Sequence, residues 1–104
     1  MSFKSIFAPG LFKNSVHIIT GGGSGIGRCT AHELVSLGAS VALVGRNEGK
    51  LKAVEQELQS IHGQCSTHVC DIRDEDGVKN TISNVLETHG RIDGLVNNAG
   101  GQFQ

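Results

Sequence analysis

The sequence predicts an α/β fold in which parallel strands alternate with helices that cover both faces of one sheet. Apolar runs of strand length alternate with stretches of helical period along the chain, and this alternation favours right-handed βαβ units. A glycine-rich turn separates the first apolar run from the first helical stretch. The length of 104 residues allows at most one domain, so we expect residues 1–104 to form a single unit.

The segment before the first strand holds two small apolar clusters around Pro9 and Gly10. We expect residues 1–15 to form an arm that packs on the domain, with a binding segment as the alternative. The first strand is predicted at residues 16–19, because a near-continuous apolar run is typical of a parallel strand buried on both faces. His17 interrupts this run, and we expect it to be a packed, hydrogen-bonded residue rather than a ligand.

The first two helices are predicted from apolar residues at helical spacing. The first covers residues 25–37, and Gly38 follows it in the left-handed conformation. The second strand comes next, at residues 41–44. The second helix begins after a cap at Asn47 and ends at Gly63. The apolar stripes are Ile26, Cys29, Leu34 and Leu37 in the first helix, and Leu51, Val54, Leu58 and Ile61 in the second.

The last part of the chain predicts a further strand, a helix and a fourth strand. The third strand, at residues 66–70, has the weakest pattern. The third helix begins after a cap at Asp74 and ends before Gly90. Its apolar stripe comprises Val78, Ile82, Val85 and Leu86. The fourth strand is predicted at residues 92–96, and N-N-A-G follows at residues 97–100.

The glycine-rich turn carries the pattern T-G-x-x-x-G-x-G and not the common G-x-G-x-x-G fingerprint. Its members are Thr20, Gly21, Gly25 and Gly27. Glycine permits positive φ and lets a ligand approach the backbone closely, and the amides at the start of the following helix favour an anion. The turn therefore predicts a phosphate-binding loop, with a flexible linker as the alternative.

This turn, together with N-N-A-G, resembles the short-chain dehydrogenase/reductase family. The resemblance implies a Rossmann-type sheet with the strand order 3-2-1-4, the first half of a doubly wound fold, in an NAD(P)-binding unit. The segments F-A-P-G-L-F and G-G-Q-F look most like the branch with enoyl-CoA and dienoyl-CoA reductases, and alcohol dehydrogenases of terpenoid catabolism are similar too. The resemblance covers essentially this whole chain but only the N-terminal part of a family member, truncated before the catalytic half.

The resemblance also implies which residues contact the cofactor. They are Gly21, Gly22, Gly23, Ser24, Gly25, Ile26, Gly27, Arg46, Asp71, Ile72, Asn98, Ala99 and Gly100. The glycine turn would contact the adenosine ribose and the phosphates. The Asp71 carboxylate would accept a hydrogen bond from the adenine amino group and the Ile72 backbone would bind a ring nitrogen, although Asp71 could also be an ordinary turn residue. From its amide side chain, Asn97 is expected to connect neighbouring strands.

Arg46 indicates which dinucleotide is bound. It lies nineteen residues after Gly27, at about the distance where such folds recognise the 2′ position of the ribose. A guanidinium there pairs with phosphate oxygens, which favours NADP over NAD; a solvated arginine at a helix start is the alternative. Many NADP-preferring relatives also have a basic residue in the glycine turn, where this chain has Ser24.

The catalytic residues of the family are absent from this chain. Its members use a Tyr-x-x-x-Lys pair, and the sequence has no tyrosine. We therefore expect the NADP(H)-binding portion of an oxidoreductase, inactive alone, whose complete form acts on an acyl-CoA, aldehyde, ketone or alcohol and forms a homo-oligomer. A non-catalytic NADP sensor is the alternative. An epimerase of the extended branch ranks last, because its T-G-x-x-G-x-x-G pattern requires glycine at Ser24.

Charge and cysteine content exclude several classes of function. The net charge of −1 offers no attraction to nucleic acid or an anionic membrane, and we find neither a membrane-spanning run nor a secretory signal. Three cysteines without a C-x-x-C pair indicate reduced thiols in the cytoplasm and no metal site. Cys29 and Cys70 are expected to be small buried residues. An uncovered last strand predicts that the isolated chain aggregates.

Overall fold

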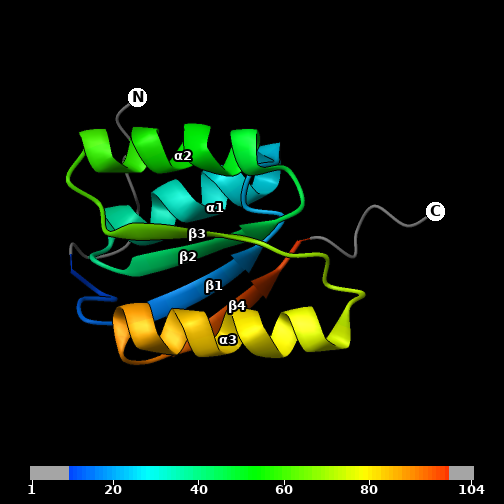
Figure 1. The fold of residues 1–104 in the computed structure, drawn as a ribbon. Helices are drawn as coiled ribbons and strands as arrows, with labels where there is room; N and C mark the ends of the chain where they lie inside the picture. The colour runs from blue at the N-terminus through cyan, green and yellow to red at the C-terminus, as the bar shows by residue number, and fades with distance from the viewer. Residues whose placement is uncertain (1–9, 99–104) are drawn as a thin grey trace.

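The computed structural model describes residues 10–98, which form a four-stranded parallel sheet with the order β3-β2-β1-β4 (Figure 1). The strands are β1 (Val16–Thr20), β2 (Ser40–Gly45), β3 (Cys65–Val69) and β4 (Gly94–Asn97). The helices are α1 (Gly25–Ser36), α2 (Glu48–Ser60) and α3 (Glu75–His89). This architecture confirms the predicted Rossmann-type α/β fold and its strand order.

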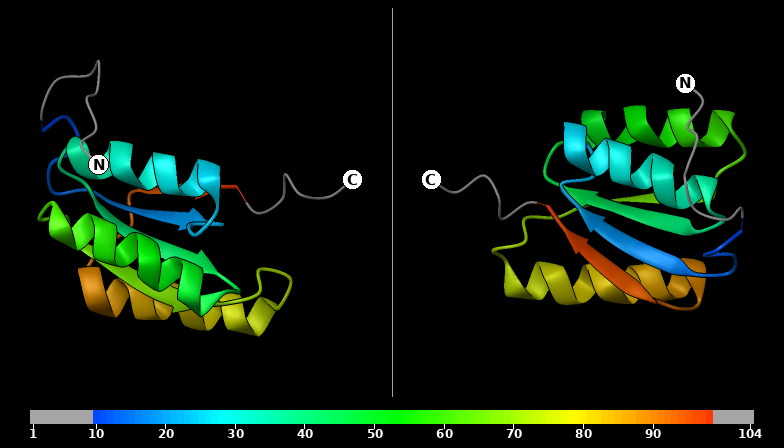
Figure 2. Two further views of the ribbon diagram at one scale, coloured as in Figure 1. Left: turned by 90° about the horizontal axis from the view of Figure 1, so that it is seen from above. Right: turned by 180° about the vertical axis from the view of Figure 1, so that it is seen from behind.

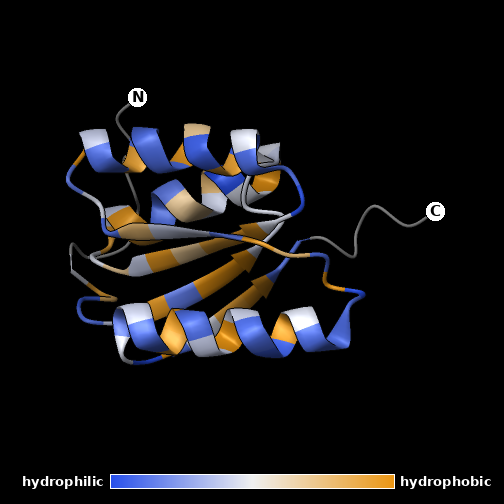
Figure 3. Ribbon diagram, viewed as in Figure 1, coloured by the Kyte–Doolittle hydropathy of each residue, from blue (hydrophilic) through white to orange (hydrophobic). Residues whose placement is uncertain are grey.

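Helices α1 and α2 cover one face of the sheet, and α3 covers the other (Figures 1 and 2). Ile18 lies beside Ala42 and Ile19 beside Leu43; because side chains alternate between faces, the first pair faces α3 and the second faces α1 and α2. The core on the α1 and α2 side contains Ile19, Ala31, Val41, Leu43, Leu51, Val54 and Leu58. The core on the α3 side contains Val16, Ile18, Ala42, Val44, Cys70 and Val85. In Figure 3 much of the sheet between the two helix layers is orange, the colour of hydrophobic residues.

Each helix begins with a polar side chain that accepts a hydrogen bond from an amide of the first turn. Asn47 Oδ1 accepts from Lys50 N at 3.0 Å in α2, and Asp74 Oδ1 accepts from Gly77 N at 3.2 Å in α3. Both predicted caps are therefore confirmed. Helix α1 is capped by Ser24, and this cap is part of the glycine turn described below.

The buried face of α1 matches the predicted stripe only in its second half, where Leu37 is buried and Leu34 packs against the core. Cys29 is exposed and Ile26 has 74% of its surface exposed, so the expectation that Cys29 is buried was wrong. The residues that α1 buries are Gly27, Ala31 and His32. Small side chains let a helix approach its neighbours closely, so this face is made by residues that a search for large apolar side chains does not count. Cys70, in contrast, is buried as predicted.

The end of α2 is set by close packing against α1. The helix ends at Ser60, and the chain turns at His62, which has a φ of 64°. Gly63 N donates to Leu58 O at 2.7 Å. A Cβ on Gly63 would lie 2.6 Å from Val35 Cγ1 in α1. Gly63 is therefore required for its contact with α1, while His62 and not Gly63 has the left-handed backbone.

Helix α3 buries only part of its predicted stripe. Val85 and Thr81 are buried against the sheet, whereas Ile82 and Leu86 are exposed. The helix ends as predicted, because the cap residue Gly90 has a φ of 82° and its amide donates to Leu86 O at 2.8 Å. One apolar edge of α3 therefore faces outward in this structure.

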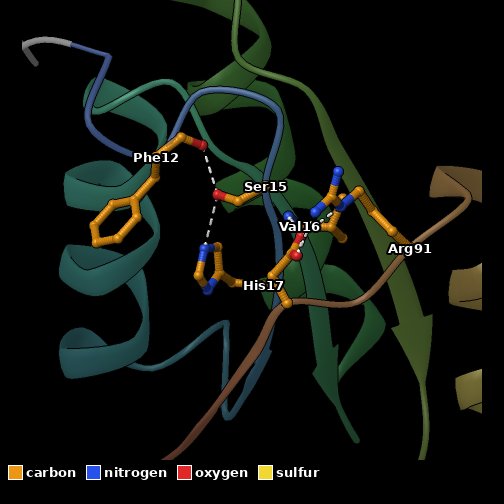
Figure 4. A network of polar contacts seen from close by, with 6 residues as sticks. Phe12, Ser15, Val16, His17 and Arg91 are labelled. Atoms are coloured by element: carbon orange, nitrogen blue, oxygen red, sulfur yellow. Dashed lines mark hydrogen bonds and ion pairs between the residues drawn. The ribbon is translucent and has the colours of Figure 1, made fainter.

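The loop before β4 is attached to the start of β1 by charged residues (Figure 4). Asp93 N donates to Val16 O, and Val16 N donates to Asp93 Oδ2, both at 2.8 Å. Arg91 holds the same carboxylate through two bonds, Nε to Oδ2 at 2.9 Å and Nη2 to Oδ1 at 2.7 Å. These contacts keep the pKa of Asp93 below its usual range. The strand itself begins at Gly94, two residues later than predicted.

His17 has the packed, hydrogen-bonded environment expected of it. Its Nε2 lies 2.9 Å from Ser15 Oγ, and its ring meets that of Phe12 edge-on at a centroid distance of 5.5 Å (Figure 4). A Cβ at position 94 would lie 2.6 Å from His17 Nδ1. Strand β4 therefore pairs beside this histidine because residue 94 is glycine.

Candidate functional site

A pocket of about 510 Å³ opens at the carboxyl ends of β1, β2 and β3, where the loops after these strands converge. Its lining residues are Gly21, Gly23, Ser24, Val44, Gly45, Arg46, Asn47, Lys50, Leu51, Cys70, Asp71, Ile72 and Arg73. In open parallel sheets, ligands bind at this edge, beside the point where the strand order reverses. Here the order reverses at β1, which lies between β2 and β4. The pocket is therefore where this fold is expected to bind a ligand.

The glycine turn leaves no space for side chains at key positions. Gly21 has a φ of 66°, a conformation that favours glycine. A Cβ on Gly27 would lie 2.1 Å from Gly21 O, and one on Gly23 would lie 2.7 Å from Lys50 Cβ in α2. A Cβ on Gly25 would meet nothing within 4 Å. The turn is therefore folded tightly on itself and against α2, and one wall of the pocket is bare backbone.

Ser24 connects the glycine turn to the start of α1. Its hydroxyl donates to Gly21 O at 2.7 Å and accepts from Gly27 N at 3.5 Å, which makes it the N-cap of the helix. The first turn of α1 contains no acidic residue, so no carboxylate of that turn offsets the positive end of the helix dipole, whose cap residue Ser24 lines the pocket. The Ser24 hydroxyl proton is already used within the turn.

The loop after β2 contributes two cations. Arg46 and Lys50 both line the pocket, and they are separated by the start of α2. Neither side chain forms a hydrogen bond or ion pair within the described residues 10–98. Lys50 was not predicted from the sequence. The signal that would have found it is a second cation shortly after Arg46, close to the predicted cap Asn47 at the carboxyl end of a strand.

The loop after β3 holds a carboxylate in a fixed orientation. Arg73 Nε donates to Asp71 Oδ1 at 3.0 Å and Arg73 Nη2 donates to Asp71 Oδ2 at 2.9 Å. The Arg73 amide also donates to Asp71 Oδ1 at 3.0 Å. These bonds to Arg73, with a smaller contribution from the charge of Arg46, lower the pKa of Asp71 to about 2. Asp71 is therefore an ionised acceptor at the pocket wall, and Arg73, which sequence reasoning missed, positions it.

The end of β4 is joined to β1 through Thr20. The Thr20 hydroxyl lies 3.0 Å from Asn97 Oδ1 and 3.3 Å from Val96 O, and it accepts from Asn98 N at 3.0 Å. This contact confirms that Asn97 connects neighbouring strands. Asn98 does not line the pocket, and its Nδ2 is buried without a hydrogen-bond partner in the part of the chain that the structure describes. Two further predicted contacts, at positions 99 and 100, lie outside the described residues.

The structure brings together part of the predicted site. The predicted residues that line the pocket are Gly21, Gly23, Ser24, Arg46, Asp71 and Ile72. Those that do not line it are Gly22, Gly25, Ile26, Gly27 and Asn98. Gly27 instead packs against the Gly21 backbone within the turn, and Ile26, the second residue of α1, has an exposed side chain. Binding of a cofactor by these residues remains a prediction.

Comparison with known proteins identifies the family. The family model of the short chain dehydrogenases matches residues 15–104. The chain belongs to the short chain dehydrogenase family. This result confirms the family predicted from the turn T-G-x-x-x-G-x-G. The members of this family are oxidoreductases.

Three relatives within the short chain dehydrogenase family show how much of a member this chain represents. A probable 2,4-dienoyl-CoA reductase of Bacillus subtilis is 37% identical over 86 residues, covering 83% of this chain and 34% of the relative. A citronellol catabolism dehydrogenase of Pseudomonas aeruginosa is 54% identical, with a TM-score of 0.89 over 91% of this chain and 40% of its own. The structure of a metagenomic short-chain oxidoreductase in complex with NADP is 42% identical. It matches with a TM-score of 0.80 over 85% of this chain and 40% of its own. The chain therefore spans about a third of the length of its curated relatives.

The donor groups at the pocket fit a nicotinamide dinucleotide. Bare backbone at the glycine turn, beside the positive end of the α1 dipole, suits a pyrophosphate, and the ionised Asp71 is an acceptor for an amino group. Within residues 10–98, no three histidine, cysteine or acidic side chains come together as metal ligands. No helix in the described range is long and apolar enough to cross a membrane.

Proposed function

We propose that this chain is the NADP(H)-binding portion of a short-chain oxidoreductase. The observation that carries the proposal is the convergence of three features on one pocket: the glycine turn, the N-cap Ser24 of α1 and the guanidinium of Arg46. A dinucleotide has a pyrophosphate for the first two, and NADP has a ribose phosphate for the third. Its membership of the short chain dehydrogenase family supports the oxidoreductase activity of the complete protein.

Each wall of the pocket would hold one part of the nucleotide. The α1 amides and the glycine turn would bind the pyrophosphate, whose charge the helix dipole favours. Asp71 would accept a hydrogen bond from the adenine amino group, and the Ile72 backbone would contact the ring beside it. Asn98, whose amide nitrogen is buried without a partner within residues 10–98, would line the adenosine side of the cofactor. The bound nicotinamide supplies hydride transfer.

Arg46 would select NADP over NAD. Its guanidinium has no partner within residues 10–98 and lines the pocket, so it is available to a phosphate. Such a charge-assisted hydrogen bond contributes about 1.5–3 kcal/mol, or roughly a tenfold to hundredfold difference in affinity. A relative of the same family is bound to NADP, which supports this choice.

The substrate of the complete protein is proposed by class. The relatives named above include a dienoyl-CoA reductase and a dehydrogenase of citronellol catabolism, so we expect an enoyl-CoA or a carbonyl or alcohol compound. Protonating such a substrate needs a positioned acid. The chain has no tyrosine, so we expect this 104-residue portion to bind the nucleotide without turnover.

Calorimetric titration of the full-length protein with NADPH and NADH tests the proposal. We expect NADPH to bind about ten to a hundred times more tightly, and Arg46→Ala to remove most of that difference while NADH affinity stays unchanged. Binding of neither nucleotide would refute the proposed function. Equal affinities would refute only the role of Arg46, and turnover by the 104-residue chain alone would refute its predicted inactivity.

A further inference from the structure

We propose that Lys50 is a second specificity-determining residue, which binds the 2′-phosphate of the nucleotide together with Arg46. The inference rests on the proposed function, because it concerns the same pocket. Lys50 lines that pocket from the first turn of α2, on the side where Arg46 precedes the helix. The two cations thus line one pocket from either side of the α2 N-cap Asn47.

The backbone of Lys50 is fixed against the glycine turn. Its amide donates to the cap oxygen of Asn47 at 3.0 Å. The Lys50 Cβ packs so closely on the glycine turn that a Cβ added to Gly23 would lie only 2.7 Å from it. The flexible side chain of Lys50 therefore starts at the pocket wall, immediately beside the turn that would hold the pyrophosphate.

Of the three cations at the pocket, two are available to a ligand. Arg73 is committed to both carboxylate oxygens of Asp71, at 2.9 and 3.0 Å. Lys50 and Arg46 have no side-chain partner among the residues that the structure describes. The next lysine of α2, Lys52, pairs with Glu55 at 3.4 Å and does not line the pocket. Lys50 therefore differs from Arg73 and Lys52, because it both lines the pocket and has no carboxylate partner among the described residues.

Charge balance requires a second cation here. A phosphate monoester carries about −1.5 to −2 charges at pH 7. Asp71 and Arg73 neutralise each other, so Arg46 alone would leave about 0.5 to 1 negative charge without a partner. Lys50 supplies the missing charge. The N-terminus of α2, whose cap residue Asn47 borders the pocket, adds the favourable end of a helix dipole.

The test uses two small probes that differ by one phosphate, 2′,5′-ADP and 5′-AMP, titrated calorimetrically against the full-length protein. Lys50→Gln should weaken binding of 2′,5′-ADP about tenfold and leave binding of 5′-AMP within about twofold. Lys50→Arg should retain the preference, because it keeps the charge. Lys52→Gln, the matched control, removes one charge from the same helix and should change neither affinity.

The outcomes separate the inference from the function on which it rests. If Lys50→Gln binds both probes as the wild type does, or loses both equally while its thermal unfolding is unchanged, Lys50 does not select the phosphate and the inference is wrong. An equal loss with Lys52→Gln would mean that general charge and not the pocket is responsible, which also overturns it. If the wild-type protein binds neither probe, the proposed function itself fails.

Discussion

Gly25 and Gly27 stand two positions apart in the glycine turn, but their surroundings make opposite demands on a side chain. A Cβ on Gly27 would lie 2.1 Å from a backbone oxygen, which has no rotamer with which to move away, whereas a Cβ on Gly25 would meet open space. The two glycines belong to the same sequence pattern. Only the structure shows that one of them maintains the shape of the turn.

We therefore predict that Gly27→Ala and Gly25→Ala have opposite effects on stability. Gly27→Ala should lower the free energy of unfolding by about 1–3 kcal/mol or more, because the new methyl group overpacks fixed backbone. Gly25→Ala should leave it unchanged or raise it by up to about 1 kcal/mol, because alanine restricts the unfolded chain. Urea denaturation of the full-length variants measures both, and equal effects would contradict the packing described here.

Only some residues of the pocket could be predicted from the sequence. Arg46 and Asp71 were predicted because they follow strands at the edge where parallel sheets bind ligands. Lys50 and Arg73 were missed because their roles depend on neighbours: one extends from a helix that Gly23 holds close, and the other bonds a carboxylate two residues away. The bond from Arg73 in particular depends on side-chain conformation, which the spacing of residues in the sequence does not encode.

Helices α1 and α2 are joined by one carboxylate. Glu57 Oε1 in α2 lies 2.7 Å from Arg28 Nε and 2.8 Å from His32 Nε2, both in α1. A carboxylate only accepts hydrogen bonds, so His32 Nε2 carries a proton. His32 is 2% exposed, and its Nδ1 has no partner within residues 10–98. Glu57 therefore satisfies the one buried ring N–H in the contact between these helices.

We predict that Glu57→Ala lowers the free energy of unfolding by about 1–3 kcal/mol, because it leaves a buried donor unsatisfied. Lys79→Ala is the control. It breaks the exposed Lys79–Glu75 pair of α3, which spans 3.7 Å, and should cost no more than about 0.5 kcal/mol. Urea denaturation of both variants compares them, and similar losses would mean that burial of His32 does not set the cost.

A hydroxyl links β3 to the end of α3. Ser66 Oγ lies 2.7 Å from His68 Nε2 and 2.8 Å from His89 Nε2. Burial lowers the pKa of both histidines, and for His68 the charge of His89 adds to the effect while Glu55 opposes it. Burial therefore favours the neutral form of both rings in the folded protein.

The lowered histidine pKa values predict acid sensitivity. The unfolded imidazoles take up protons near the ordinary value of 6.5, while the folded ones resist, so the free energy of unfolding should fall as pH drops below about 6.5. His89→Gln removes one of the two groups and should reduce the change measured between pH 7 and pH 5. His62→Asn, at an exposed position with a positive φ, should not; an unaltered change in His89→Gln would refute the assignment.

Element types were predictable where local chemistry decides them. The caps at Asn47 and Asp74 follow from side chains that compete for free amides, and buried parallel strands have continuous apolar runs. The first half of the α1 stripe was wrongly predicted, because Gly27, Ala31 and His32 make the buried face there in place of Ile26 and Cys29. For α3, Ile82 and Leu86 fit the period but lie outside the area that the four strands cover. Helical period indicates a stripe, but the extent of the sheet decides how much of it is buried.

At the scale of the whole molecule, apolar surface gathers on the α3 side. Leu95 in β4 pairs with Ile18, whose side of the sheet faces α3, yet Leu95 is 64% exposed. Ile82 and Leu86 of α3 are exposed on the same side. Strand β4 is also at the edge of the sheet. An apolar edge strand beside exposed helix residues is a template for association.

We predict that the 104-residue chain by itself associates through this edge. Leu95→Thr should reduce its light scattering at a given concentration, because threonine keeps the strand propensity but removes apolar surface. Leu11→Thr, an equal chemical change at another exposed leucine, should have little effect. Equal scattering from the Leu95→Thr variant and the wild type would locate the association elsewhere.

The bond between Val16 N and Asp93 joins residues 77 positions apart, and it has a consequence for biosynthesis. The ribosome adds about 5–20 residues per second, so the strand made first waits roughly 4–15 seconds before its second neighbour exists. During that interval the nascent polypeptide has β1 paired to β2 on one side only. Molecular chaperones that bind extended apolar segments have their opportunity in that window, which closes when β4 emerges from the exit tunnel.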